Sequence, residues 1–99
     1  MACFDLHTLR DGSGLAVDVQ SDLLDEFGTR VVVPLIDRVH APEAPRRLTP
    51  IFDIDGQAMI LATPLLSAVP TGMLGPSAGS LAAYQDQIRA ALDMLFLGF

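Results

Sequence analysis

The chain has 99 residues, of which 51% are hydrophobic and 18% are charged, and its formal net charge is −6. A length of 99 residues suits a single domain, 1–99, and so apolar a chain is expected to cover part of its surface with a partner or a second copy. Its six basic residues are all arginines and are outnumbered by twelve acidic residues, so no direct nucleic-acid binding is expected.

The single cysteine, Cys3, excludes an internal disulfide and is typical of a reducing compartment, so we expect a cytoplasmic protein. It lies in an apparent first strand and is expected to pack as a small hydrophobic side chain. The N-terminal residues do not form a basic region followed by an apolar one, so no secretory signal is predicted. No apolar run reaches the roughly 18 residues of a membrane span, so no membrane association is expected.

A first hairpin is predicted for residues 2–20. Residues 2–10 alternate between apolar and polar side chains, as a strand with one buried face does. The turn residues 11–14 then lead into a second strand, 15–20. Apolar and polar side chains alternate in this strand as well, so we expect Asp18 to lie on a solvated face.

The middle of the chain is predicted to hold a third strand, an irregular loop and a second hairpin. Residues 30–36 are rich in β-branched side chains and contain a proline, which favours a position near a sheet edge. Residues 37–50 include three prolines and predict a loop. Asp55-Gly56 lies between two apolar runs and favours a type I′ turn, in which both residues have positive φ. Another short strand is expected near 66–70.

The end of the chain is predicted to form a helix. Residues 71–80 contain three glycines and a proline, which predicts a turn-rich connection, and Ser80 is a suitable N-cap. Apolar residues then recur with helical spacing on one face, and Gly98 ends the helix. This face comprises Leu81, Tyr84, Ile88, Ala91, Leu92 and Leu95. The fold class is therefore predicted as mostly β with a C-terminal α-helix.

No catalytic or metal-binding constellation stands out in the sequence. His7 and His40 are the only imidazoles and lack ligand-spaced companions. Neither Ser13 nor Ser21 lies in a nucleophile-elbow pattern. An acidic stretch is interpreted as a solvated strand face and turn, with acid–base roles left open; it comprises Asp18, Asp22, Asp25 and Glu26. We therefore expect no cofactor, no metal and no enzymatic activity.

The last six residues, 94–99, are apolar almost without interruption. Because a helix turns only one face inward, part of this tail is expected to meet something other than the core of its own chain. A dimer seam and a partner-binding knob are the two natural candidates. Folding of the tail back onto its own domain is the alternative that the sequence leaves open.

Several segments, in shared order and spacing, resemble the CcdB family of toxins from toxin–antitoxin systems. Residues 17–22 (VDVQSD) are similar to the family's second-strand signature, and residues 91–99 (ALDMLFLGF) resemble its helix and tail. The matching residues between them are Gly28, Arg30, 33–35 (VPL), Leu48, Pro50, Ile54, Gly56, Thr63, 69–70 (VP) and 74–75 (LG). The resemblance runs nearly from end to end.

The resemblance implies an SH3-like small barrel of the CcdB/MazF type with a C-terminal helix, forming a two-fold homodimer. It also implies that this dimer binds the A subunit of DNA gyrase through its paired C-terminal tails and traps the gyrase–DNA cleavage complex, without being an enzyme. A CcdA-like antitoxin would wrap the toxin and neutralise it.

By position, the resemblance assigns three sets of residues. The gyrase-binding residues would be Leu23, Leu24, Asp93, Leu97, Gly98 and Phe99. The dimer interface would comprise Met94, Leu95 and Phe96, and the antitoxin-binding loop would comprise Arg10, Asp11, Gly12, Ser13 and Gly14. Leu97 stands where the family usually carries a tryptophan.

Two other functions remain open. A MazF-like endoribonuclease would need a basic groove and an arginine placed for phosphate chemistry, for which Arg30 is the candidate; the net acidity of the chain counts against this function. A non-toxic CcdB relic, suggested by Leu97, would bind the antitoxin without arresting growth.

Overall fold

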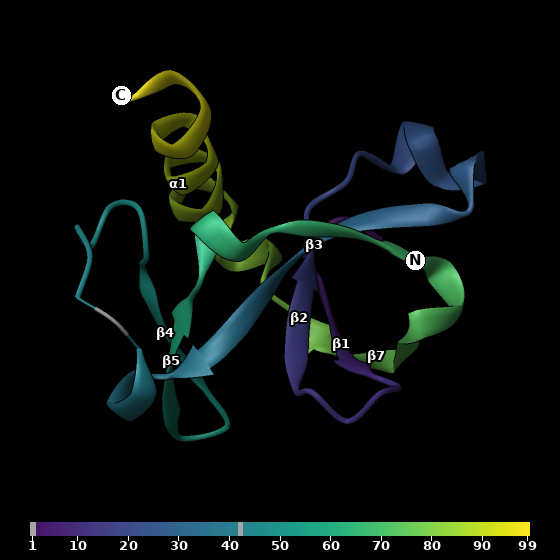
Figure 1. Ribbon diagram of the computed structural model, residues 1–99, viewed down its shortest axis with the longest axis horizontal. Helices are drawn as coiled ribbons and strands as arrows, with labels where there is room; N and C mark the ends of the chain where they lie inside the picture. The colour runs from purple at the N-terminus through teal and green to yellow at the C-terminus, as the bar shows by residue number, and fades with distance from the viewer. Residues whose placement is uncertain (1, 42) are drawn as a thin grey trace.

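The computed structural model describes residues 2–41 and 43–99. Over these residues, seven strands form one curved sheet in the order β4-β5-β3-β2-β1-β7, with β6 paired to β3, and helix α1 packs against it (Figure 1). The elements are β1 (Asp5–Leu9), β2 (Leu15–Asp18), β3 (Thr29–Asp37), β4 (Ile51–Ile54), β5 (Gln57–Leu61), β6 (Ser67–Pro70), β7 (Leu74–Ser80) and α1 (Gln85–Leu97). The predicted fold class, mostly β with a C-terminal α-helix, is confirmed.

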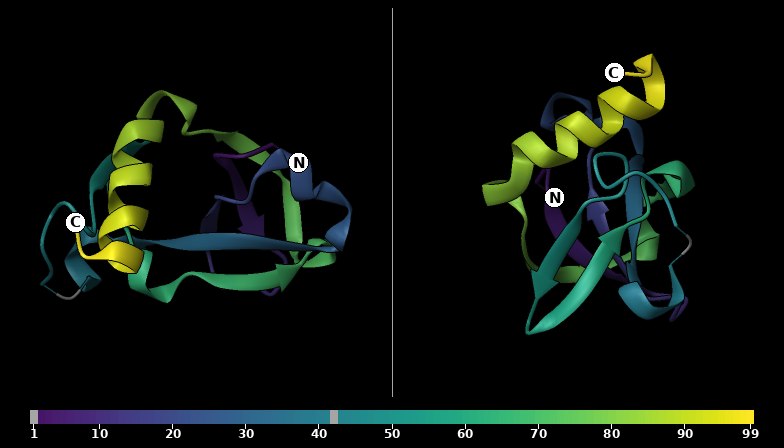
Figure 2. Two further views of the ribbon diagram at one scale, coloured as in Figure 1. Left: turned by 90° about the horizontal axis from the view of Figure 1, so that it is seen from above. Right: turned by 90° about the vertical axis from the view of Figure 1, so that its left-hand side faces the viewer.

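Strand β3 is the longest strand and crosses the whole molecule (Figure 2). One edge of it pairs with β2, while the other pairs first with β6 through residues 29–32 and then with β5 through residues 35–37. Pro34 lies where these two partners change, so its missing N–H removes no ladder hydrogen bond there, and its carbonyl accepts one from the Ala62 amide at 2.9 Å. The prediction of an edge strand is therefore wrong.

The turn-rich connection predicted for residues 71–80 is also wrong, because β7 occupies most of it and pairs with β1. Gly75 lets the backbones of β7 and β1 approach each other closely. A Cβ atom on Gly75 would lie 2.7 Å from Oγ1 and 2.9 Å from the carbonyl oxygen of Thr8. A strand glycine that lets two backbones meet looks, in the sequence, like a turn glycine.

The predicted β4–β5 hairpin is confirmed by its backbone. Asp55 has a φ of 52° and Gly56 a φ of 84°, so both central residues adopt the left-handed conformation that a type I′ turn requires. The expected strand near 66–70 is present as β6.

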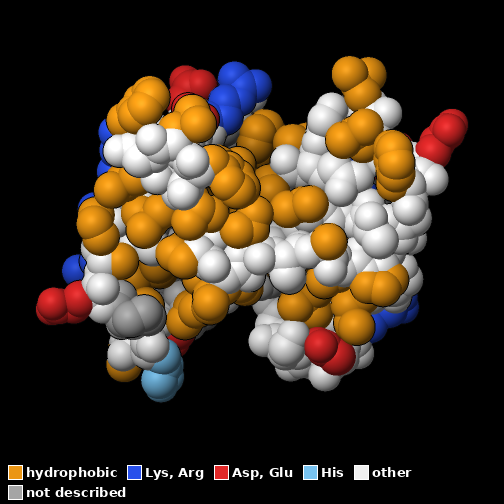
Figure 3. Space-filling view, turned by 45° about the horizontal axis from the view of Figure 1, so that its top comes forward, with side chains coloured by type: hydrophobic (Ala, Val, Ile, Leu, Met, Phe, Trp, Pro, Cys, Tyr) orange, Lys and Arg blue, Asp and Glu red, His pale blue; other side chains and the backbone are white. Residues whose placement is uncertain are grey.

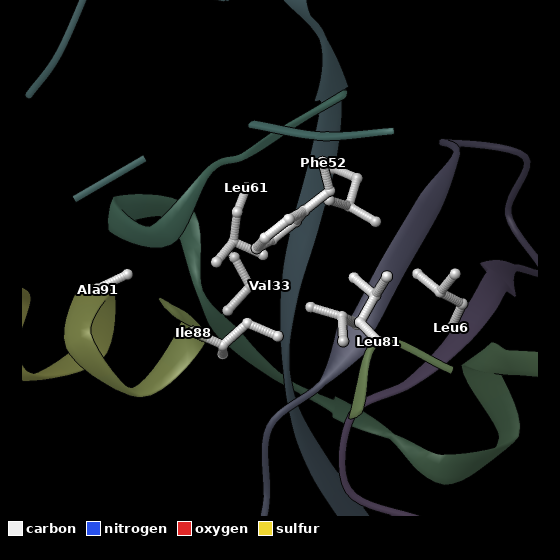
Figure 4. Packing of buried hydrophobic residues seen from close by; sticks show 9 residues of the cluster. Leu6, Val33, Phe52, Leu61, Leu81, Ile88 and Ala91 are labelled. Carbon is white, nitrogen blue, oxygen red and sulfur yellow. The ribbon is translucent and has the colours of Figure 1, made fainter. Parts of the chain in front are cut away.

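The core lies between the curved sheet and α1 (Figure 4). Ile88 and Ala91 of the helix are fully buried and pack with Leu81, Phe52 and Leu61 from the chain around them. The predicted helical face is only partly buried. Its member Tyr84 is 40% exposed and stacks its ring at 4.8 Å, tilted, on that of Phe52.

The helix begins later than predicted. The Ser80 hydroxyl accepts a hydrogen bond from the Ala82 amide at 3.1 Å, but the N-cap of the short 3₁₀ turn η5 (Ala82–Tyr84) is Leu81, and α1 follows at Gln85 with Tyr84 as its N-cap. The prediction of Ser80 as the N-cap is therefore wrong. In the part of the chain that the structure describes, no helix has the length and apolarity to cross a bilayer.

Gly75→Ala is expected to lower the free energy of unfolding by about 1–3 kcal/mol, because the new methyl group must push β7 away from β1. Gly72→Ala is the matched control, since its Cβ would meet nothing within 4 Å. We expect it to be neutral or to stabilise by up to about 1 kcal/mol. Equilibrium urea denaturation of both variants measures the difference, and equal stabilities would contradict this account of β7.

Candidate partner-binding surface

The end of α1 presents apolar side chains to solvent. Gly98 ends the helix with a φ of 81°, and its amide donates to the Met94 carbonyl at 3.0 Å. Phe96, Leu97 and Phe99 are 66%, 60% and 71% exposed. The tail therefore does not fold back onto its own domain, because the buried stripe of the helix ends at Ala91 and the last turn continues past the core.

The other predicted tail residues differ in exposure. Asp93 is exposed, whereas Met94 and Leu95 are half-buried. Of the expected dimer residues, Phe96 thus offers the largest free surface.

A second exposed apolar group lies on η1 (Asp22–Phe27), the short 3₁₀ segment between β2 and β3. Leu23 is 94% exposed, Leu24 45% and Phe27 73%. The two leucines are among the expected gyrase-binding residues, whereas Phe27 was not predicted. Its signal in the sequence is an aromatic residue directly before Gly28, in a segment with no strand or helix periodicity. We call Leu23, Leu24 and Phe27 the η1 knob.

A buried arginine underlies η1. Arg30 on β3 has no exposed surface, and its guanidinium donates four hydrogen bonds. Its Nε and Nη2 reach both carboxylate oxygens of Asp18 at 2.7 and 3.0 Å, and its Nη1 reaches Asp25 at 2.9 Å. Nη2 also donates to the Gln20 carbonyl at 3.0 Å and lies 3.6 Å from Asp22. We call Arg30, Asp18 and Asp25 the Arg30 clamp.

Asp18 is consequently not on a solvated face, and that prediction is wrong. Its side chain is fully buried because the bidentate pair with Arg30 compensates the desolvation of both charges. Burial disfavours the charged guanidinium, but the hydrogen bond and charge of Asp18, helped by Asp25 and Asp22, outweigh it and raise the pKa of Arg30. The acidic stretch is largely a set of partners for one cation.

Polar contacts extend the clamp to the neighbouring backbone. The Gln20 side-chain amide donates to the carbonyls of Leu24 and Thr29, both at 3.0 Å, and accepts from the Val31 amide at 3.0 Å. The Asp22 carboxylate accepts from the Cys3 amide at 2.8 Å. The VDVQSD signature therefore organises the chain around η1.

The η1 segment and the last turn of α1 lie on one side of the molecule, at its opposite ends (Figures 1 and 2). Hydrophobic side chains spread over this face, and charged ones lie mostly toward its edges (Figure 3). A cleft of about 420 Å³ lies between η1 and α1, lined by Leu23 and Asp22 on one side and Arg89 and Leu92 on the other. Within one chain, Leu23 thus faces the middle of α1 across this cleft, and Leu97 is not part of its lining.

The predicted antitoxin loop, residues 10–14, is exposed at the far end of the molecule from the tail (Figure 1). Arg10 Nε donates to the Leu74 carbonyl at 3.2 Å. The Ser13 amide donates to Asp11 at 2.9 Å, and hydrogen bonds from Ser13 lower the pKa of Asp11. Gly12 and Gly14 have positive φ, so the loop is a tight turn of defined shape.

The two histidines do not form a site for chemistry. His7 is buried and its Nδ1 donates to the Gly75 carbonyl at 2.8 Å, whereas His40 is exposed. No group of three metal-ligating side chains occurs in residues 2–41 and 43–99.

Cys3 lies in a turn just before β1, not within a strand as predicted, and it is half-buried. Burial raises the pKa of its thiol, and the charges of Asp18 and Asp22 raise it further. The thiol is therefore held in its protonated, poorly reactive form.

The family model for the CcdB protein matches residues 4–98. The chain belongs to the CcdB family. It is therefore a toxin of the toxin–antitoxin class, as the resemblance of its signature and tail implied.

Solved structures share the fold at low identity. The Mycobacterium tuberculosis toxin MazF-mt6 is 15% identical with a TM-score of 0.76, covering 93% of this chain and 95% of its own. An endoribonuclease in complex with its cognate antitoxin, from a mycobacterial species, is 13% identical with a TM-score of 0.76, covering 100% and 98%. An endoribonuclease from a mycobacterial species is 12% identical with a TM-score of 0.73, covering 95% and 88%. The CcdB/MazF-type barrel is confirmed.

These structures correct one expectation. The chain was expected not to be an enzyme, and this is contradicted because structures that share its fold over nearly its whole length are endoribonucleases. The expectation rested on the lack of a recognisable catalytic pattern in the sequence and on the resemblance to the CcdB family. A barrel that supports RNA cleavage elsewhere gives no ground for that exclusion.

Arg30→Met is expected to lower the free energy of unfolding by about 3–5 kcal/mol, because it leaves Asp18 as a buried charge without a partner. The exposed Arg38 supplies the control, and Arg38→Met should stay within about 0.5 kcal/mol of the wild type. Urea denaturation at one fixed protein concentration checks both. An Arg30→Met variant as stable as the wild type would show that the clamp does not stabilise the barrel.

The raised pKa of Cys3 predicts slow thiol chemistry. At pH 8 a smaller fraction of this thiol is ionised than in a free cysteine, and only the thiolate reacts. The reaction with DTNB should be several-fold slower in the folded protein than in the same protein unfolded in urea. Equal rates would show that the thiol is neither desolvated nor influenced by the two aspartates.

Proposed function

We propose that this toxin acts on the A subunit of DNA gyrase through the C-terminal tails of a homodimer and traps the gyrase–DNA cleavage complex. The observation that carries the proposal is the exposed apolar end of α1, with Phe96, Leu97 and Phe99 each at least 60% exposed. Exposed apolar side chains gathered at one chain end, beyond the core, are typical of a binding surface.

A two-fold dimer would place two such tails side by side. The interface proposed from Met94, Leu95 and Phe96 uses the half-buried and exposed sides of the last two helical turns. The dimer would then present Leu97, Gly98 and Phe99 twice to a partner that is itself two-fold. Engaging the DNA-cleaved state of gyrase in preference to the resealed state shifts its population toward cleaved DNA.

A CcdA-like antitoxin is the second partner proposed. A structure with this fold, an endoribonuclease, is solved in complex with its cognate antitoxin. The exposed turn 10–14 lies away from the tail. An antitoxin bound at this turn would therefore block the tail either with a second segment of the antitoxin or by sterically excluding gyrase.

Leu97→Asp is expected to weaken binding to the gyrase A subunit by at least about thirtyfold, the effect of removing a hot-spot side chain of about 2 kcal/mol. Val39→Asp is the control, because Val39 is 84% exposed on the short 3₁₀ segment Arg38–His40, which lies at the end of the molecule opposite the tail (Figure 1). Surface plasmon resonance measures the affinity, and a supercoiling assay measures accumulated cleaved DNA. Light scattering determines whether each variant remains a dimer.

A wild-type protein that neither binds gyrase nor causes DNA cleavage would overturn the proposed target. Equal losses in both variants would overturn the role of the tail. A monomeric wild type would overturn the paired-tail arrangement.

Endoribonuclease activity is the second candidate, favoured by the shared fold. Arg30, the arginine named for phosphate chemistry, is buried and paired with carboxylates. RNA cleavage by the purified chain without gyrase would support this candidate, and cleavage that persists in a folded Arg30→Lys variant would assign the chemistry to other residues.

A further inference from the structure

The η1 segment is held in place without an apolar anchor. None of its residues, Asp22–Phe27, is buried, and its three apolar side chains are exposed to solvent. A surface segment with no buried side chain has little packing energy to fix its conformation. Its shape must therefore come from hydrogen bonds and ion pairs with the elements beside it.

The charged contacts among them converge on Arg30, while Cys3, Gln20 and Ser21 add hydrogen bonds to η1. The Arg30 guanidinium is fixed on β3 by the buried bidentate pair with Asp18, and its free edge pairs with Asp25 at 2.9 Å and approaches Asp22 at 3.6 Å. The planar fork of a guanidinium fixes direction as well as distance. One buried cation thus joins the barrel to the segment that carries the η1 knob.

We infer that Arg30 is a positioning residue for partner binding: with Asp18 and Asp25 it holds η1 in the conformation that presents Leu23, Leu24 and Phe27 together. This inference rests on the proposed function for its partner, the gyrase A subunit, to which it adds Phe27 as a contacting residue. Without the clamp, η1 would sample many conformations and only a fraction of molecules would be ready to dock. The apparent affinity falls by that fraction.

Asp25→Ala tests the clamp without unfolding the barrel. The Asp25 side chain is 54% exposed and accepts the one hydrogen bond of Arg30 Nη1, so water takes its place there, while Asp18 and the Gln20 carbonyl keep Nε and Nη2 bonded. Glu26→Ala is the matched control, since it removes the same charge from the adjacent exposed residue. Thermal unfolding of both variants should stay close to that of the wild type.

Hydrogen exchange of residues 22–28, followed by mass spectrometry, reports on the clamp independently of gyrase. Asp25→Ala should exchange there at least about tenfold faster than Glu26→Ala, with unchanged exchange in β2 and β3. Equal protection in the two variants would overturn the clamp.

Binding kinetics separate positioning from contact. A lost clamp lowers the population of the competent conformation, so Asp25→Ala should slow association with the gyrase A subunit roughly tenfold relative to Glu26→Ala and leave dissociation nearly unchanged. Phe27→Ser removes a contact and should instead speed dissociation about tenfold or more. Val39→Ser, at an exposed valine on another surface, should do neither.

The outcomes are distinguishable. Faster exchange in Asp25→Ala with unchanged gyrase kinetics would overturn the positioning role. Failure of the wild-type chain to bind gyrase would overturn the proposed function, while the exchange result would still uphold or overturn the clamp.

Discussion

The pairing of Arg30 with Asp18 is the constraint on which the η1 part of the candidate surface depends. Moving two ions out of water costs several kcal/mol for each, and only close, fully hydrogen-bonded geometry offsets that cost. Both oxygens of Asp18 are used, at 2.7 and 3.0 Å, so the pair fixes the relative position of β2 and β3. Because Arg30 has a further N–H donor that bonds Asp25, the same pair also fixes the position of η1 on the outside of the barrel.

The two exposed apolar groups therefore differ in what gives them shape. The tail continues a helix whose buried residues, Ile88 and Ala91, anchor it through the core, so its geometry follows from helix periodicity. The η1 knob has no such anchor and depends on the Arg30 clamp. A partner that engages both groups binds one surface whose shape is set by apolar packing and another whose shape is set by a buried ion pair. Changes in salt concentration or substitutions of single carboxylates should therefore alter the conformation of the η1 knob more than that of the tail.

The features that could be predicted from the sequence are those that residues close together in the chain determine. Asp55-Gly56 carries its own turn geometry, and the apolar run at the end of α1 exceeds what one helix face can bury. The pairing of Asp18 with Arg30 joins residues that lie twelve positions apart on different strands. The alternation of apolar and polar residues in the second strand does not reveal this pair, so it wrongly predicted an exposed carboxylate. Gly75 likewise looks like a turn residue until Thr8 is beside it. Contacts between distant segments decided each of these errors.

The fold shared with endoribonucleases makes the state of Arg30 decisive for any chemistry of this chain. To bind a phosphate, a guanidinium must offer free N–H groups to solvent, and this one donates four hydrogen bonds to protein acceptors while having no exposed surface. Releasing it would leave Asp18 charged and unpaired inside the barrel, a loss that a single phosphate contact does not offset. Catalysis here would require a cation other than Arg30. In this chain the geometry of Arg30 favours a role in holding η1 over a role in phosphate chemistry, so a shared fold does not by itself assign this toxin the activity of the endoribonucleases.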